Sequence, residues 1–518
     1  MNQAEFSFWL TVVALAVDFV IRVVAIIIVP RNRRPSSALG WLLAIFFIPY
    51  IGVILFLLIG SPRLGRKRRR RQREINQFIL DSTEGFDKVA HDKSWPVWLD
   101  RVVELNRNLG AIPLVGGNSA QMQIDYEKNI IDIAADIDNA QNFVHVEFYI
   151  LSSDPVTEPV FQAMERAVQR GVEVRVLFDH VAAMRTVGYR KTKKRLTAIG
   201  VDWHLMLPFL PFQGKYERPD LRNHRKLVII DGNIGWMGSQ NLIDSSYLKK
   251  SNLKRGLHWK DAMVRLRGPI VAGLNAIFIT DWYSETDVLL TREAEPIVAF
   301  HEDQTLDCQI VPSGPGFASE NNLRLFLTLM YSAQEKIIIT SPYFVPDESL
   351  MYAITSACQR GVRVELFVSE IGDQALVYHA QRSYYEALLR AGVVIWLYKA
   401  PTILHSKHMS IDDEVAVIGS SNMDMRSFSL NLEVSLMVRG ASFVKQMRDV
   451  EDAYREMSRA LTLEEWKKQP LRSTVLDGLA RLTSSLQELG SIHGIRRSIH
   501  SLRHHELPPQ REVWTEAS

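Results

Sequence analysis

Cysteine is nearly absent from this chain of 518 residues, which contains only Cys308 and Cys358. Two cysteines cannot build a disulfide framework, and such scarcity is typical of a reducing compartment. No spaced group of Cys, His and carboxylates stands out either, so the sequence gives no indication of a zinc site. At this length the chain can form two hydrophobic cores and additional segments.

A net positive charge is also missing once the first 74 residues are set aside. The formal net charge of the whole chain is +3, but residues 1–74 hold 12 Lys and Arg against 3 Asp and Glu, which leaves 49 against 55 in residues 75–518. A nucleic-acid enzyme normally shows a basic surface over its binding region. The charge distribution therefore argues against a nucleic-acid partner.

Long hydrophobic runs are confined to the N-terminus, at 8–29 and 38–60. Each would be about 33 Å long as a helix at about 1.5 Å per residue, enough to cross a hydrocarbon core of about 30 Å. A signal peptide fits poorly, because no basic segment precedes the first run and a second run follows at once. Asp18 and Arg22 lie four residues apart and can pair on one helix face. The two runs predict a transmembrane helical hairpin within residues 1–62.

Basic residues flank the second run unequally. Three arginines lie before it (Arg31, Arg33 and Arg34), and eight Lys and Arg residues follow it within 63–73. The positive-inside rule therefore predicts that the remainder of the chain faces the cytoplasm, with the N-terminus on the same side. The basic juxtamembrane segment and linker at 63–108 either binds an anionic membrane surface or serves only as a flank that stops transfer.

One short pattern occurs twice in the remainder of the chain. The first copy consists of His224, Lys226 and Asp231 followed by Ser239 and Asn241, and the second consists of His405, Lys407 and Asp412 followed by Ser420 and Asn422. The spacings agree position for position, and each Ser belongs to a Gly-Ser-x-Asn sequence. Repetition of six identities at fixed offsets is not a chance event.

Each copy can be arranged as a β-hairpin with a two-residue turn. Asp231-Gly232 is a type I′ turn signal, and Asp412 begins the corresponding turn in the second copy. This layout places His224 across from Ser239, and His and Lys share one strand face. Each Asp then lies at the other end of its hairpin, roughly 20 Å away at about 3.3 Å per residue. We therefore expect the Asp to form the turn and support the scaffold rather than to take part in chemistry.

Weaker matches surround the two copies. Gln169-Arg-Gly-Val-Glu-Val is echoed by Gln359-Arg-Gly-Val-Arg-Val, and each reads as a helix end with a Gly cap that continues into a strand. Further along the chain, Asp261 and Glu433 open two matching strands. Alternating helices and strands predict two similar α/β halves, at 109–300 and 301–462, each a sheet flanked by helices.

These residues resemble the phospholipase D superfamily, in which H-x-K-x-x-x-x-D occurs twice and two α/β halves form one shared active site. The resemblance spans residues from about 110 to 460. It implies a phosphohistidine intermediate, with His224 as the nucleophile and His405 as general acid and base, or the reverse. It also implies that Asp261 and Glu433 each orient one imidazole. Lysine and asparagine side chains then meet the phosphate charge, so no metal or cofactor is expected.

Among membrane-bound members, the chain resembles the bacterial cardiolipin synthases. The matching segments are Pro49-Tyr50, Arg222-Asn223, Ser341-Pro342-Tyr343 and Arg426-Ser427-Phe428. The resemblance implies transfer of a phosphatidyl group from one phosphatidylglycerol to another, giving cardiolipin and glycerol at the bacterial inner membrane. A membrane-bound hydrolase, or a transferase with another alcohol acceptor, would use the same residues. A silent scaffold is disfavoured, because both copies of the motif are intact.

The segment at 463–518 follows the second half. Apolar residues recur there at helical spacing (Val475, Leu479, Leu482, Leu486 and Leu489), which predicts an amphipathic helix that lies on the membrane surface or packs on the core. Pro508-Pro509 and scattered charges indicate a disordered tail beyond it.

Overall fold

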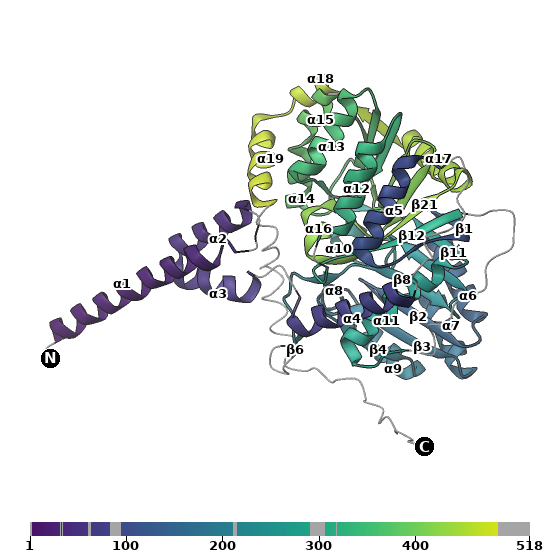
Figure 1. Cartoon of the computed structure of the whole chain (residues 1–518), viewed down its shortest axis with the longest axis horizontal. Helices are drawn as coiled ribbons and strands as arrows, with labels where there is room; N and C mark the ends of the chain where they lie inside the picture. Colours follow the sequence, from purple (N-terminus) through teal and green to yellow (C-terminus); the bar gives the residue numbers. More distant parts are fainter. Residues whose placement is uncertain are drawn as a thin grey trace, which may run out of the picture.

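A computed structural model describes residues 3–31, 33, 35–60, 64–82, 95–210, 215–290, 306–317 and 319–484. Leu486, Leu489 and the predicted tail lie outside the described residues. Figure 1 shows an α/β body from which the N-terminal helix α1 projects. The predicted fold class, two similar halves with sheets flanked by helices, is confirmed.

The elements before and within the first half follow in chain order. They are α1 (Gln3–Ile28), α2 (Pro35–Phe47), α3 (Pro49–Ile59), α4 (Arg66–Ser82), α5 (Val97–Gly110), β1 (Leu114–Gln123), α6 (Tyr126–Asp138), β2 (Phe143–Phe148), α7 (Glu158–Gln169), β3 (Glu173–Asp179), α8 (His180–Arg185), α9 (Tyr189–Ile199), β4 (Asp202–Met206), β5 (Phe209–Leu210), β6 (Lys215–Tyr216), β7 (Arg222–Asn223), β8 (Lys226–Ile230), β9 (Ile234–Gly238), α10 (Lys250–Arg255), β10 (His258–Lys260), β11 (Met263–Arg267) and α11 (Ile270–Thr286).

The second half has a similar order of helices and strands. Its elements are β12 (Leu306–Ser313), α12 (Asn321–Ser332), β13 (Lys336–Thr340), β14 (Phe344–Val345), α13 (Glu348–Gln359), β15 (Arg363–Ser369), α14 (Ala375–Arg382), α15 (Tyr385–Ala391), β16 (Val394–Tyr398), β17 (Thr402–Leu404), β18 (His408–Ile411), β19 (Val415–Gly419), β20 (Met423–Asp424), α16 (Met425–Ser429), β21 (Asn431–Arg439), α17 (Ala441–Glu456) and β22 (Ser458–Leu461), followed by α18 (Leu463–Lys467) and α19 (Leu471–Ser484).

Sixteen of the described strands join into one sheet, in the order β22-β16-β15-β13-β18-β19-β21-β12-β1-β11-β9-β8-β2-β3-β4, with β7 attached to β21, and the others form the two-stranded sheets β10-β17, β14-β20 and β5-β6. The halves meet where β1 pairs antiparallel with β12. Each half has three parallel strands, β2-β3-β4 or β13-β15-β16, next to an antiparallel hairpin. Gly171 and Gly361 take φ of 87° and 88° where α7 and α13 end, so the helix-to-strand turns match as well.

The predicted register of the two hairpins was wrong by one residue. The closing pairs are Ile230 with Ile234 and Ile411 with Val415, so three residues rather than two connect the strands. Asp231 (φ 50°) and Gly232 (φ 64°) do form a turn with positive φ. The following residue adds one unpaired position before the strand resumes. As a result, His224 does not lie across from Ser239.

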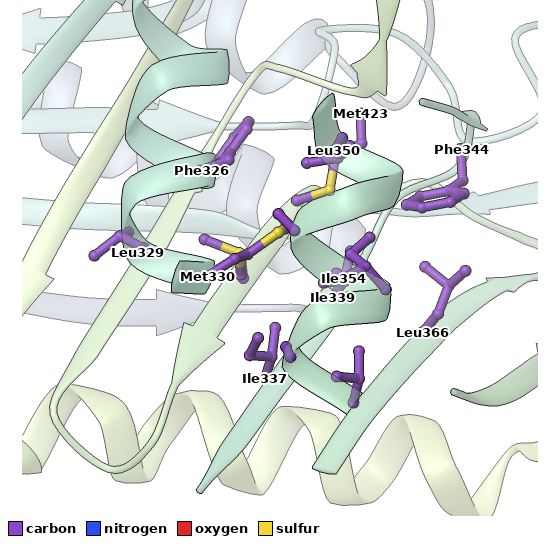
Figure 2. Packing of buried hydrophobic residues seen from close by; sticks show 14 of the residues in the cluster. Phe326, Leu329, Met330, Ile337, Ile339, Phe344, Leu350, Ile354, Leu366 and Met423 are labelled. Atoms are coloured by element: carbon purple, nitrogen blue, oxygen red, sulfur yellow. The ribbon is translucent and has the colours of Figure 1, made fainter. Parts of the chain in front are cut away.

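Helices and strands of the second half enclose a continuous apolar core. Figure 2 shows Phe326 and Met330 of α12 and Leu350 and Ile354 of α13 packed over β13 and β15. Leu99 of α5 belongs to the same cluster. The segment before the first half therefore ends in a helix that is part of the core of the second half.

The membrane segment differs from the predicted hairpin of two spanning helices. Among the described residues, only Glu5–Ile28 of α1 is long and apolar enough to span a membrane, and the second apolar run is broken into α2 and α3. Pro49 lacks the amide that would continue the helix. At about 1.5 Å per residue, α2 and α3 are roughly 20 and 17 Å long, short of a core of about 30 Å. The Asp18–Arg22 pair is confirmed, at 2.9 Å.

The two short helices fold back on each other. The rings of Trp41 in α2 and Phe56 in α3 meet edge to face, with centroids 5.4 Å apart. A Cβ on Gly52 would lie 2.8 Å from the Ala44 carbonyl oxygen, so the close approach of the two helices requires glycine there. The prediction of a second full-length spanning helix therefore fails because proline and glycine allow a sharp reversal.

The basic helix α4 packs on the body through two of its arginines. Arg68 donates to Glu285 through both terminal nitrogens (2.8 and 2.7 Å) and to Glu217 through Nε at 2.7 Å. Arg71 pairs with Asp287 and donates to backbone carbonyls at the end of α11. Tyr216 donates to a carbonyl oxygen at the end of α3 at 3.1 Å. Part of the basic run therefore fixes the body next to the membrane segment.

Candidate active site

Two short parallel strand pairs cross between the halves and place the motif histidines. In the first, β7 runs beside the start of β21, so the His224 amide donates to the Leu432 carbonyl at 2.9 Å. In the second, β10 runs beside β17, and the His405 amide donates to the Lys260 carbonyl at 2.7 Å. Leu432 and Lys260 directly precede the two predicted acids. Each crossing therefore brings a histidine of one half next to an acid of the other.

Glu433 holds the imidazole of His224. The Nδ1 atom lies 3.0 Å from both carboxylate oxygens and 3.1 Å from the Ser420 carbonyl oxygen. Ser420 also donates its hydroxyl proton to Glu433 at 2.5 Å. Because the partners of Nδ1 are acceptors, the proton sits on Nδ1, and Nε2 is left with its lone pair. This is the tautomer that a nucleophilic imidazole needs.

Asp261 holds the imidazole of His405 in the same way. The Nδ1 atom lies 2.7 Å from Asp261 Oδ1, which also accepts the Ser239 hydroxyl proton at 2.6 Å. The first half therefore supplies the serine and the acid for the histidine of the second half. The sequence predicted that each acid orients one imidazole, but it gave no sign that the pairs are exchanged between halves.

Burial and charge act in opposite directions on these groups. Burial lowers the pKa of His224 to about 4, although the Glu433 carboxylate acts to raise it. Burial also lowers the pKa of His405, and the Asp261 carboxylate acts to raise it. Burial raises the pKa of Asp261, but the His405 and Lys407 charges outweigh it and lower the pKa to about 2. The acids are therefore ionised near neutral pH, and the imidazoles are neutral until a ligand brings further negative charge.

The motif lysines lie at the same place. Lys407 Nζ lies 3.2 Å from His405 Nε2 and donates to its carbonyl at 2.6 Å, and Lys226 donates to the His224 carbonyl. Burial lowers the pKa of Lys226 to about 7 and that of Lys407 to about 8. The Lys407 charge also lowers the pKa of His224, as Lys226 does for His405. The two motif copies therefore act on one another within one site.

The motif asparagines have different surroundings. Asn241 donates to the Tyr247 hydroxyl at 2.8 Å and accepts the Ile150 amide at 3.2 Å. Asn422 is buried, and its backbone amide donates to Ser427 Oγ at 3.2 Å. One amide side chain is therefore held by a tyrosine, whereas the other is placed through its backbone.

Asp231 and Asp412 lie away from the imidazoles, at the far ends of their hairpins. Asp231 accepts three backbone N–H groups at the start of β2, from Gln141 (2.7 Å), Asn142 (2.7 Å) and Phe143 (2.8 Å). Asp412 accepts three corresponding amides at the start of β13, at 3.0, 2.8 and 2.8 Å. Each carboxylate therefore ties its hairpin to the neighbouring parallel strand.

Two tyrosines next to the histidines were not predicted as site residues. The Tyr149 ring lies edge to face with His224 at 4.8 Å and 5.5 Å from Lys226 Nζ. Tyr343 lies edge to face with His405 at 6.3 Å and donates to Asp373 at 3.0 Å. Each follows the first parallel strand of its half, Tyr149 directly after β2 and Tyr343 three residues after β13, so their positions in the two repeats are similar but not identical. An aromatic residue close behind each of these strands was the signal in the sequence that could have identified them.

Metal-binding geometry is not evident in the described part of the chain, where no group of three or more His, Cys, Asp and Glu side chains could hold an ion. The ionisable groups at the site are two lysines and two imidazoles, each imidazole backed by a carboxylate. Such a set suits a phosphodiester, whose negative oxygens need fixed cationic donors.

Comparison with known proteins agrees with this geometry. The family description "Cardiolipin synthase, PLD-like domain" matches residues 133–282 and 326–453, and "Phospholipase_D-nuclease N-terminal" matches residues 20–61. The chain belongs to the cardiolipin synthase family of the phospholipase D superfamily. It is therefore a phosphatidyltransferase of phospholipid biosynthesis that associates with the membrane.

Individual relatives cover most of the chain. Cardiolipin synthase A of Proteus mirabilis is 33% identical over 464 residues, which are 88% of this chain and 94% of that protein. Cardiolipin synthase A of Pectobacterium atrosepticum is 30% identical over 496 residues, 93% and 97% of the two chains. The crystal structure of phosphatidylserine synthase from Haemophilus influenzae shares the fold, with a TM-score of 0.56 and 16% identity over 74% of this chain and 98% of that one.

Proposed function

We propose that the enzyme transfers a phosphatidyl group from one phosphatidylglycerol to the glycerol hydroxyl of a second, giving cardiolipin and free glycerol. The two imidazoles support this proposal most directly, because each has its Nδ1 held by a carboxylate and a lysine beside it. Two imidazoles in opposite protonation states are what a two-step transfer through the enzyme needs.

In the first proposed step, His224 Nε2 attacks phosphorus, and the bond from phosphorus to the glycerol oxygen breaks. His405, protonated once the phosphate anion is bound, gives its proton to that oxygen. In the second step, His405 takes the proton of the acceptor hydroxyl, the new oxygen–phosphorus bond forms, and the bond to His224 breaks. Lys226 and Lys407 stabilise the negative oxygens in both steps.

Products from pure phosphatidylglycerol test the proposal. Purified full-length enzyme supplied with phosphatidylglycerol alone should release cardiolipin and glycerol in equal amounts, with little phosphatidic acid. Added glycerol should convert preformed cardiolipin back to phosphatidylglycerol, because a phosphohistidine accepts any alcohol that reaches it. If phosphatidic acid dominates at every lipid density, water is the acceptor, and the hydrolase alternative replaces the transferase.

We also propose that the α/β body lies on the cytoplasmic side of the bacterial inner membrane. The eight Lys and Arg residues in 63–73 support this orientation through the positive-inside rule. A protease added to sealed inverted membrane vesicles should digest the body, whereas the same protease outside intact spheroplasts should not. Digestion only in spheroplasts would reverse the orientation.

A further inference from the structure

Helix α19, near the end of the described chain, buries charge and exposes leucine. Among its residues 471–482, for which burial is described, Asp477 and Ala480 are buried, with exposed fractions of 3% and 4%. Asp477 accepts from His379 Nδ1 at 2.6 Å and from Arg382 Nε at 3.3 Å, both on α14. An amphipathic helix on a soluble body normally does the reverse and buries its apolar side.

The apolar stripe of α19 consists of Leu471, Val475, Leu479 and Leu482, with Leu476 beside it. Their spacings of four, four and three residues place the first four on one face. These five side chains are 50–79% exposed. The contacts of Asp477 with α14 fix the rotation of α19 about its axis. The apolar stripe is therefore held on the outward face of the helix.

The location of α19 on the body indicates the kind of surface that its apolar stripe faces. Figure 1 shows α19 on the side of the body from which α1, α2 and α3 project. Those helices carry the membrane-spanning run and many exposed apolar side chains. Lys467, Lys468 and Arg472 are exposed around the first turn of α19, where they can meet anionic headgroups. The stripe therefore belongs to a helix on the same side of the body as the membrane segment.

We propose that α19 is a second membrane contact, which lies in the bilayer surface with its apolar stripe among the acyl chains. The contact is close to the candidate site, because α14 carries the partners of Asp477 and begins directly after Asp373 and Gln374. Asp373 and Gln374 bind the hydroxyl of Tyr343, whose ring contacts His405. Insertion of α19 would thus hold the His405 end of the site at the depth of the lipid headgroups.

Lipid-borne quenching tests this contact without any turnover, so its result is independent of the proposed function. One cysteine at a time is introduced at Leu479, Leu482 or the exposed Thr474 and labelled with an environment-sensitive fluorophore in the full chain, with Cys358→Ser as background and the buried Cys308 left in place. Thr474 is the control, because it lies on α19 outside the stripe. In phosphatidylglycerol vesicles with brominated acyl chains, we expect several-fold stronger quenching at Leu479→Cys and Leu482→Cys than at Thr474→Cys.

Two results would overturn the proposal. Equal quenching at all three positions would show that the stripe does not enter the bilayer. Protection from aqueous iodide without quenching by lipid would mean that protein covers the stripe. In that case, dependence on protein density would identify a second copy, and loss of protection after truncation at Ser484 would identify residues 485–518.

A functional comparison adds an independent readout. The triple variant Leu476→Ser, Leu479→Ser and Leu482→Ser changes only exposed side chains, so the body should still fold. We expect its rate on vesicle phosphatidylglycerol to fall several-fold and its rate on monomeric short-chain phosphatidylglycerol to stay unchanged. Equal losses on both substrates would contradict a role in membrane contact.

Discussion

The two imidazole–carboxylate pairs should respond differently when the carboxylate is neutralised. Asp261 lies 2.7 Å from His405, and Glu433 lies 3.0 Å from His224. In the proposed mechanism His405 begins the reaction protonated, whereas His224 begins it neutral. Asp261→Asn and Glu433→Gln each keep the side-chain shape and remove one charge, so they form a matched pair of variants.

Asp261→Asn should move the pH profile. Burial lowers the pKa of His405, and the Asp261 carboxylate raises it. An opposite charge at this distance shifts a pKa by about 1 to 3 units. Without it the imidazole loses its proton at lower pH, so the alkaline limb of the kcat profile should move down by about 1 to 3 pH units. Well above that limb, this corresponds to a rate loss of about 10- to 1000-fold.

Glu433→Gln should lower kcat without moving that limb. Burial already lowers the pKa of His224 to about 4, so this imidazole is neutral near pH 7 with or without Glu433. The carboxylate matters when the ring becomes positively charged on bonding to phosphorus. Loss of such a preorganised partner costs about 3 to 4 kcal/mol, or a factor of about 100 to 1000 in kcat.

Cardiolipin formation by both variants can be followed by mass spectrometry across about pH 5 to 9, the range in which imidazoles titrate. Thermal unfolding serves as the control for folding, since both acids are buried. A shift in Glu433→Gln but not in Asp261→Asn would exchange the roles of the two histidines. No shift in either variant would refute the reasoning that the carboxylates set the protonation of the imidazoles.

Three further outcomes are expected. Asp231→Asn should lower the free energy of unfolding by about 1 to 3 kcal/mol, because three backbone N–H groups lose a charged acceptor. The kcat of the folded variant should change little. A variant with native stability and a lower kcat would contradict the scaffold role of Asp231. Arg68→Gln should loosen α4 and speed proteolysis between α3 and α5, whereas Arg70→Gln, a change at an exposed arginine, should not. Equal rates of proteolysis in the two variants would count against a role of Arg68 in holding α4 on the body. Cardiolipin formation should persist in excess chelator. If chelator abolished the activity and added zinc restored it, the reaction would follow another mechanism.

The body of the protein was largely predictable because its signals are local. Gly171 and Gly361 mark helix ends by their positive φ, and the repeated motif marks two equivalent strands in each half. The hairpin register was not predictable in the same way. Asn233 and Glu414 each extend a two-residue turn to a three-residue loop. No conformational preference of these residues distinguishes the longer loop from the shorter one.

The membrane segment shows the limit of hydropathy. Residues 38–60 are apolar throughout, so length and composition alone predict one spanning helix. The reversal at Pro49 depends on Gly52 passing close to Ala44, a tertiary contact that composition does not contain. Similarly, the α4 arginines form a basic run in the sequence, but Arg68 binds two carboxylates that lie far along the chain.

The exchange of acids between halves makes the fold and the site interdependent. A separate first half would contain Asp261 without His405 and Lys407, whose charges lower its pKa in the whole protein, and a separate second half would contain Glu433 without His224 and Lys226. Removing one partner of a buried hydrogen-bonded pair leaves the other unsatisfied, which costs about 1 to 3 kcal/mol and more for a charged group. The same crossings, β7 with β21 and β10 with β17, supply the tautomers that the proposed chemistry needs. The carboxylate of each half therefore contacts the other half and sets the tautomer of that half's histidine. For this reason we expect neither half to be active alone.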